Sequence, residues 1–218
     1  MKKEFAVIGL GRFGGSIVQY LSTHDYDVLA IDVDEERVSQ FMHIASYAVV
    51  VDAMDETALK SLGIRNFDHV IVAIGENLNA SILTTIILKE LGVEHITVKA
   101  QSVYHEKILK KIGATQVVHP ERDMGERIAK QLISNNVFDY LDLSEEYSIV
   151  ELVATDKISN KSLIDLNVRV KYDLNIIGIK RENKMNVSPI PNEKLQKDDL
   201  IFVIGHNDKI EDFRKNEF

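Results

Sequence analysis

The sequence has no cysteine, and this absence excludes three kinds of site. Disulfide bonds, thiolate metal centres and cysteine nucleophiles all need a thiol group. The seven histidines do not replace it, because none lies at a spacing typical of a metal centre or a Ser-His-Asp triad. The residues of a catalytic centre are therefore missing from the sequence pattern, and we predict that the chain is not an enzyme.

Positive charge is also scarce, with 26 lysine and arginine residues against 34 aspartate and glutamate residues. The formal net charge of −8 does not provide the basic surface typical of nucleic-acid binding, so no nucleic-acid partner is expected.

Long apolar runs are missing from the sequence as well. The most apolar stretch, residues 82–88, is much shorter than the roughly 20 residues that a membrane-spanning helix needs.

The clearest motif lies near the start, where the apolar run of residues 5–8 leads into Gly-Leu-Gly-Arg-Phe-Gly at residues 9–14. In such a motif Gly9 permits a tight turn from strand to helix, Gly11 lets a pyrophosphate approach the backbone, and Gly14 lets the helix pack on the sheet. The N-terminus of that helix offers free N–H groups and the positive end of its dipole to phosphates. The motif therefore predicts a nucleotide-binding turn.

A second apolar run, residues 28–31, ends at Asp32. This position lies about 20 residues beyond the glycines, where a carboxylate can accept hydrogen bonds from ribose hydroxyls. A carboxylate there repels a 2′-phosphate, so NADP should bind poorly, but it does not distinguish NAD from ADP or ATP. Arg12 lies inside the glycine turn and is suited to reach a further phosphate. The alternative is that Arg12 is a solvated arginine at the start of the helix.

Short apolar runs alternate with helical stretches up to about residue 135, and most of the runs are continuous rather than alternating, as in parallel strands covered on both faces. We therefore predict an α/β fold with a Rossmann-like, doubly wound parallel sheet. The expected strands are residues 4–9, 27–32, 47–51, 69–74, 95–99 and 116–118. The expected helices are residues 14–23, 35–43, 56–62, 79–91, 103–112 and 123–133.

The pattern changes after residue 147, where strands are separated by only short helices. Strands are expected at residues 148–153, 175–180 and 199–205, and helices near residues 162–165 and 208–214. This predicts a small α+β domain, with domain bounds of 1–134 for the nucleotide-binding domain and 135–218 for the C-terminal domain. A domain of this size is marginal alone, so we expect it to dimerise or to pack against the first domain.

Two further predicted strands end in residues suited to a nucleotide. Asp52 and Ala53 follow the run of residues 49–51, and Asp52 is suited to accept a hydrogen bond from an adenine amino group; the alternative is that it caps the next helix. The run of residues 70–74 leads into Gly75 and Glu76, and Ala73, Ile74 and Gly75 are expected to line the path of the ribose and phosphates.

Taken together, these motifs strongly resemble an RCK (KTN, TrkA-N) domain, and the tail from residues 145–151 to residues 204–205 resembles its companion TrkA-C domain. The segments 63–67, 98–101 and 119–121 resemble the peripheral gating subunits of Ktr-type bacterial potassium uptake systems. The resemblance implies a cytoplasmic regulatory subunit on the inner face of the cell membrane. It implies that ATP and ADP binding gates potassium flow through a KtrB-like membrane subunit, and that homodimers form an octameric ring. The alternatives are an NAD(H)-binding oxidoreductase and an NADH redox sensor.

The resemblance also implies site residues. The nucleotide, ATP or ADP with NAD(H) as the alternative, would be surrounded by Gly9, Gly11, Arg12, Phe13, Gly14, Asp32, Asp52, Ala53, Ala73, Ile74, Gly75, Glu76 and Lys99. Arg12 would contact the terminal phosphate of ATP, and Glu121 would help to hold Mg²⁺ or another cation; the alternative for Glu121 is a surface carboxylate. Cyclic di-AMP is implied as a second ligand, at Ile164, Val168, Arg169, Asn175, Ile177, Pro191 and His206. Without the family, the aliphatic members of that set are better explained as core.

Overall fold

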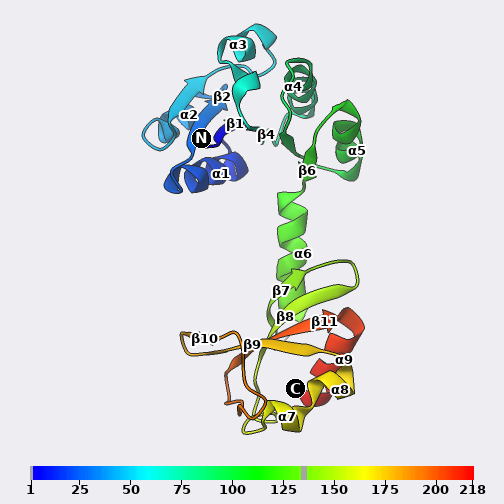
Figure 1. The fold of residues 1–218 in the computed structure, drawn as a ribbon. Coiled ribbons are helices and arrows are strands. Elements are labelled where there is room, and N and C mark those ends of the chain that lie inside the picture. The colour runs from blue at the N-terminus through cyan, green and yellow to red at the C-terminus, as the bar shows by residue number, and fades with distance from the viewer. Residues whose placement is uncertain (1, 134–136) are drawn as a thin grey trace. The chain divides into compact units, whose positions relative to one another are not determined.

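The computed structural model describes residues 2–133 and 137–218. The chain divides into two compact units, Met1–Arg122 and Asp123–Phe218 (Figure 1). The predicted domain boundary between residues 134 and 135 lies outside the described residues. The first unit carries the predicted nucleotide motif, and the second carries the predicted α+β domain.

The first unit is built on a six-stranded parallel sheet with the strand order β3-β2-β1-β4-β5-β6. The order reverses beside β1, so the two halves of the sheet diverge where the glycine turn leaves it. This confirms the predicted Rossmann-like, doubly wound sheet. The strands are β1 (Glu4–Ile8), β2 (Asp27–Asp32), β3 (Tyr47–Val50), β4 (His69–Val72), β5 (Ile96–Lys99) and β6 (Gln116–Val118).

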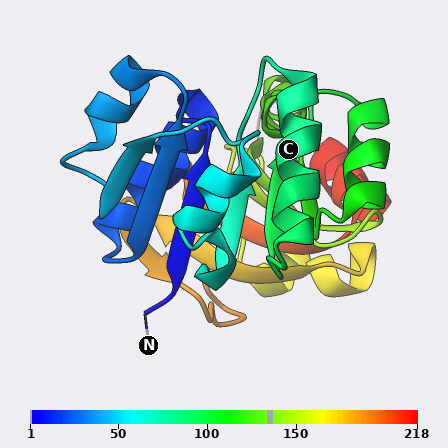
Figure 2. The ribbon, with the colours of Figure 1, turned by 90° about the horizontal axis from the view of Figure 1, so that it is seen from above.

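Helices cover both faces of this sheet because its strands are apolar on both sides (Figure 2). Val7 of β1 packs in one buried cluster with residues of α1 and α2, whereas Ala6 and Ile8 pack in another with residues of α3, η1, α4 and α5. Successive side chains of a strand point to opposite faces, which explains this division. The helices are α1 (Arg12–Thr23), α2 (Glu35–Phe41), α3 (Glu56–Ser61), η1 (Ile64–Asn66), α4 (Leu78–Glu90) and α5 (Val103–Ile112).

Side chains cap the N-termini of four of these helices. Asp34, Asp55, Asn77 and Ser102 each accept hydrogen bonds from backbone N–H groups of the helix that follows. Such caps satisfy N–H groups that have no partner inside the helix. The helix α1 differs, since Gly11 stands at its N-cap and no side chain caps it.

The second unit contains an antiparallel five-stranded sheet with the order β10-β9-β11-β8-β7. Alternate residues of β8 and β11 pack with α7, α8 and α9 in one buried cluster, so the helices lie on one face, and the predicted α+β class is confirmed. The strands are β7 (Val137–Asp142), β8 (Tyr147–Val153), β9 (Asn175–Arg181), β10 (Lys184–Asn186) and β11 (Leu200–His206). The helices are α6 (Pro120–Ile133), which spans the division between the units, α7 (Leu163–Leu166), α8 (Val168–Tyr172) and α9 (Asn207–Glu217).

Some sequence-based element bounds were wrong. The helix α1 begins at Arg12 rather than residue 14, because Gly11 is extended and forms the cap itself. The helix α6 begins at Pro120 rather than residue 123, which fits the preference of proline for the first helical position. The strands β7 and β10 were not predicted; they pair antiparallel with β8 and β9.

Candidate functional site

The glycine turn joins β1 to α1 at the carboxyl end of the sheet. The Gly9 N–H donates to the Ile31 carbonyl at 2.8 Å, and the φ angle of Gly9 is +96°, which strains any other residue. A Cβ on Gly14 would collide with the Gly9 carbonyl oxygen and with the Ala73 side chain. At Gly11, by contrast, an added Cβ would meet no atom within 4 Å. The turn is therefore closed against the sheet at Gly9 and Gly14, and open at Gly11.

The N-terminus of α1 is suited to an anion. Gly11 provides no side-chain cap, and no acidic side chain lies in the first turn of this helix. The first N–H groups of an α-helix have no acceptor within the helix, and the positive end of the helix dipole lies there. Arg12 is exposed and adds a positive charge beside these groups. Phosphate groups bind at helix termini of this kind.

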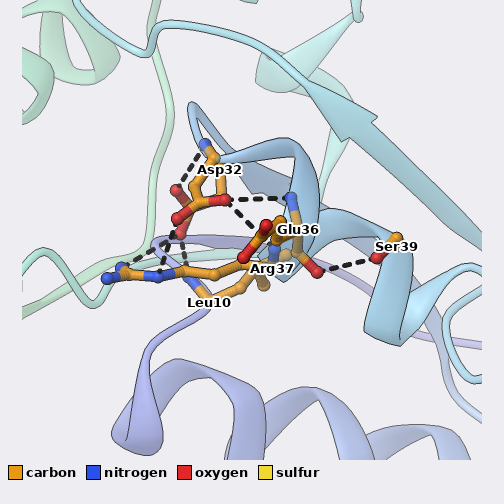
Figure 3. A network of polar contacts seen from close by, with 6 residues as sticks. Leu10, Asp32, Glu36, Arg37 and Ser39 are labelled. Carbon is orange, nitrogen blue, oxygen red and sulfur yellow. Dashed lines mark hydrogen bonds and ion pairs between the residues drawn. The ribbon is translucent and has the colours of Figure 1, made fainter.

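Asp32, at the end of β2, is the buried acid of the site, with a side chain only 6% exposed. Its Oδ2 accepts a hydrogen bond from the Leu10 N–H at 2.6 Å, and its Oδ1 accepts one from the Asp34 N–H at 3.0 Å. Arg37 approaches the same carboxylate, with 3.8 Å between its Nη1 and Oδ2 (Figure 3). The carboxylate thus fixes the glycine turn to β2, and each oxygen retains a lone pair for a ligand hydroxyl.

The other predicted strand ends surround the same turn. Ala73 is buried and contacts the glycine turn, and its N–H donates to the Ile8 carbonyl at 2.7 Å. Ile74 packs against the core, whereas Glu76 is exposed. The structure therefore brings the residues after β4 beside Gly9 and Gly14.

Asp52 and Ala53 follow β3. Asp52 is exposed, and its Oδ1 accepts a hydrogen bond from the Met54 N–H at 2.9 Å. The alternative that Asp52 caps the next helix is wrong, because Asp55 is the N-cap of α3. Ala53 is buried in the core, and its carbonyl accepts a hydrogen bond from Thr84. Asp52 keeps free lone pairs at this edge of the sheet.

Lys99 and Glu121 form an ion pair at the carboxyl ends of β5 and β6, with 2.5 Å between Nζ and Oε1. The hydrogen bond from Lys99 lowers the pKa of the Glu121 carboxyl below its usual value. The Lys99 ammonium also lies 6.0 Å from the centre of the Phe13 ring, which connects it to the glycine turn. A pocket of about 250 Å³ opens here, lined by Gly75, Lys99, Ala100, Gln101, His119, Glu121 and Arg122.

A polar network that the sequence did not predict borders this pocket. His119 is 6% exposed and its Nε2 lies 2.8 Å from Glu106 Oε2, while Lys110 Nζ lies 2.7 Å from Glu106 Oε1. Hydrogen bonds from Lys110 and then from His119 lower the pKa of Glu106 to about 2. His105 is 1% exposed, and burial, followed by the charge of His119, lowers its pKa. Gln101 also contacts the pocket edge by donating to the Gly75 carbonyl.

No group of three or more potential metal ligands occurs in residues 2–133 and 137–218. Glu121, the predicted cation ligand, is paired with Lys99. A larger hollow, of about 870 Å³, lies at the amino-terminal edge of the parallel sheet and therefore opposite the glycine turn. It is lined by Lys3, Phe5, Arg65, Asn66, Phe67, Asp68, His69, Leu91, Gly92, Glu94 and His95.

In the second unit, two pairs of the residues predicted for cyclic di-AMP are in contact. Arg169 donates from Nε and Nη2 to Asn175 Oδ1, at 2.9 and 2.7 Å. The Ile164 N–H donates to the Pro191 carbonyl at 3.0 Å, and the Ile164 side chain is 57% exposed. Val168 differs from them, since it is 4% exposed and belongs to the core.

Ile177 and His206 complete the predicted set. Ile177 of β9 is 39% exposed. His206, at the end of β11, packs edge-on against Tyr147 with 5.3 Å between ring centres. Its Nδ1 accepts a hydrogen bond from the Asp208 N–H at the start of α9. The ring of His206 is thus oriented by neighbours within its own unit.

Comparison with known proteins matches both units to family models. The TrkA-N domain matches residues 5–120, and the TrkA-C domain matches residues 147–216. Ktr system potassium uptake protein C of Bacillus subtilis is 59% identical over 215 residues, which cover 99% of this chain and 97% of that protein. Ktr system potassium uptake protein A of the same organism is 52% identical over 211 residues, covering 97% and 95% of the two chains.

A solved structure, the crystal structure of the GsuK RCK domain, has the same fold. It covers 100% of this chain and 48% of its own chain, with a TM-score of 0.69 and 15% sequence identity. Both Bacillus relatives are named as potassium uptake proteins and not as enzymes, in agreement with the expectation for this chain. Among the described residues, no helix has the length and apolar character needed to span a bilayer.

Proposed function

The chain belongs to the family of TrkA-N and TrkA-C domain proteins, as its motifs indicated, and on that premise we propose that it is a nucleotide-binding regulatory subunit of a potassium uptake system. Its similarity to two Ktr system potassium uptake proteins over nearly their whole length supports the potassium uptake role. The partner would be a KtrB-like membrane subunit that carries the potassium pathway. The regulatory subunit would act from the cytoplasmic face of that membrane.

One observation carries the nucleotide part of the proposal. The uncapped N-terminus of α1 and the buried carboxylate of Asp32 both border the open position at Gly11. The first suits phosphates and the second suits ribose hydroxyls, so together they suit an adenosine diphosphate group. ATP and ADP contain this group, and so does NAD(H). We favour ATP over NAD(H) because Arg12 and Lys99 add positive charge where a third phosphate would extend, and ADP shares the rest of the ATP molecule.

Gating would arise from a difference in affinity between two shapes of an assembly. A ligand shifts a conformational equilibrium only by its differential affinity for the two states, typically about 1–3 kcal/mol per coupled site. The third phosphate of ATP supplies such a difference if Arg12, or a cation held by Glu121, contacts it in one shape only. Homodimers that assemble into an octameric ring would multiply this coupling.

Cyclic di-AMP is the proposed second ligand, bound by the second unit. Support comes from the exposed guanidinium of Arg169 beside Asn175, which suits phosphate and adenine, and from the exposed side chains of Ile164 and Ile177. Titration with cyclic di-AMP should show binding that Arg169→Ala weakens at least about tenfold, the loss typical of a charged hydrogen bond. The exposed Lys184 gives a control of equal charge change, Lys184→Ala, which should bind normally.

The experiment that tests the main proposal is calorimetric titration of the nucleotide-free protein with ATP, ADP and NADH, with assembly size measured in the same samples. Binding of ATP and ADP by an octamer-sized species would support the proposal. Potassium uptake in cells that contain the membrane subunit should then depend on this chain. Binding of NADH alone by a dimer would overturn the proposed ligand and favour a redox sensor.

A further inference from the structure

Arg37 lies beside the Asp32 carboxylate, although neither the glycine motif nor the strand-end motif predicts an arginine there. Its Nη1 is 3.8 Å from Asp32 Oδ2, and its Nε is 3.5 Å from Asp34 Oδ2 (Figure 3). Both distances are those of loose ion pairs rather than of short hydrogen bonds. The Arg37 side chain is 46% exposed, so the guanidinium lies at the solvent-facing edge of the buried acid.

The two charged groups differ in how firmly they are held. Asp32 is buried and accepts hydrogen bonds from the N–H groups of Leu10 and Asp34, so its position is fixed. The Arg37 guanidinium is half-exposed and is held by two loose ion pairs, which constrain it weakly. A ligand that reaches Asp32 therefore meets a fixed carboxylate and a guanidinium that can turn toward it.

Asp32 and Arg37 would have opposite effects on a ligand that carries a phosphate on the ribose 2′-oxygen. If the ribose hydroxyls bind Asp32, a 2′-phosphate comes beside that carboxylate and is repelled by it. The same phosphate comes within reach of Arg37, whose planar group matches phosphate oxygens. Asp32 and Asp34 carry two negative charges against the one positive charge of Arg37, so repulsion prevails.

We propose that Arg37 is a specificity-determining residue of the adenosine site, which sets how strongly a nucleotide with a 2′-phosphate is rejected. This inference rests on the proposed nucleotide-binding function. With Asp32 charged, Arg37 only weakens the rejection of the 2′-phosphate. With Asp32 neutral, the single charge of Arg37 balances that of Asp34, so the net repulsion disappears and the Arg37 guanidinium can bind the 2′-phosphate.

The first test compares ADP with its 2′-phosphorylated analogue, which differ only at the group in question. Titration of the full chain should show that Arg37→Ala lowers the affinity for the analogue about tenfold, the size expected for one partly solvated charge pair. The affinity for ADP should change by less than about twofold, because ADP lacks the phosphate that Arg37 attracts. The control Lys111→Ala removes an exposed positive charge from the last turn of α5 and should change neither affinity.

The second test uses Asp32→Asn, alone and combined with Arg37→Ala. Asp32→Asn should reduce the rejection of the 2′-phosphate about tenfold, and the added Arg37→Ala should cancel most of that gain. Asparagine retains only one of the two acceptor oxygens of Asp32, so thermal unfolding must show that the variant is folded. The Arg37→Ala comparison leaves Asp32 intact and decides the question even if Asp32→Asn does not fold.

The possible failures are distinct. If the wild-type chain binds neither ADP nor the analogue, the proposed function and this inference are both overturned. If it binds ADP, but Arg37→Ala changes both affinities equally or not at all, the inference alone is overturned. Arg37 is then a surface ion-pair partner of α2, without influence on the choice of ligand.

Discussion

The ammonium group of Lys99 and the carboxylate of Glu121 lie 2.5 Å apart, although 22 residues separate them in the sequence. The Lys99 side chain is 13% exposed, whereas that of Glu121 is 65% exposed. The lysine is therefore the fixed partner, and the glutamate is the one that can move away at little cost. In this arrangement the Glu121 carboxylate neutralises the Lys99 ammonium group, which an anionic ligand would otherwise contact.

We predict that Glu121→Gln raises the affinity for ATP in the absence of divalent cations. The variant removes the negative charge that competes with phosphate for Lys99, and a severalfold to about tenfold gain is expected from one partly solvated charge. The enhancement of ATP binding by Mg²⁺ should shrink, because the variant also loses the proposed cation ligand. Calorimetric titration in the presence of EDTA and of Mg²⁺ measures both effects.

A matched control for this prediction is Glu94→Gln. Glu94 is exposed at the opposite edge of the sheet, so the substitution changes the net charge equally without touching the site. Equal loss of ATP affinity with and without Mg²⁺ in Glu121→Gln would contradict the competition with Lys99.

The glycine turn gives a prediction that separates binding from folding. An added methyl group at Gly11 meets no atom within 4 Å, so Gly11→Ala should retain the stability of the wild type. It should weaken ADP binding at least about tenfold, because the methyl group stands where the backbone must approach the pyrophosphate. At Gly14 the same group collides with Gly9, so Gly14→Ala should lower the free energy of unfolding by about 1–3 kcal/mol or more.

Urea unfolding without nucleotide and titration with ADP test this pair of variants. The two glycines are three residues apart in one turn, so each variant is the control of the other. Normal ADP affinity in a folded Gly11→Ala variant would exclude the phosphates from that position.

The parallel sheet could be predicted from the sequence because its strands are buried on both faces and read as continuous apolar runs. The strand β10 (Lys184–Asn186) gives no such signal, since it is short and polar and exists only through its pairing with β9. The start of α1 was placed two residues late, because a glycine cap leaves no side-chain signature in the sequence.

The members of the nucleotide site could be predicted from strand ends, but their partners could not. The turn motif predicts Asp32 as a ligand for ribose, yet its hydrogen bond to Leu10 depends on the alignment of β2 beside β1. The contact of His119 with Glu106 likewise depends on how α5 packs beside β6. Such contacts follow from tertiary packing, for which a single sequence carries no periodic signal.

The double role of Asp32 leads to a prediction for Asp32→Ala. The variant should lose adenine-nucleotide affinity, as the sequence motif predicts. It should also be less stable by about 1–3 kcal/mol, because the buried N–H of Leu10 is left without its acceptor. Binding must therefore be measured at a temperature well below the melting point of the variant. Unchanged ADP affinity in the folded fraction would remove Asp32 from the site.

The buried His105 should make folding stability sensitive to pH. Burial, followed by the charge of His119, lowers its pKa below the usual 6.5, so the unfolded chain binds a proton more readily than the folded one. Stability should therefore be at its full value above pH 6.5 and should fall as the pH drops from there toward the lowered pKa, by up to about 1.4 kcal/mol per pH unit.

The variant His105→Asn should flatten this pH dependence, because asparagine retains an acceptor for the Gln101 N–H but has no titrating ring. Urea unfolding at pH values from about 5 to about 8, on both sides of about 6.5, measures the free energy of unfolding of each variant. The exposed His43 supplies the control His43→Asn, and an equal pH dependence in wild type, His105→Asn and His43→Asn would contradict the assignment to His105.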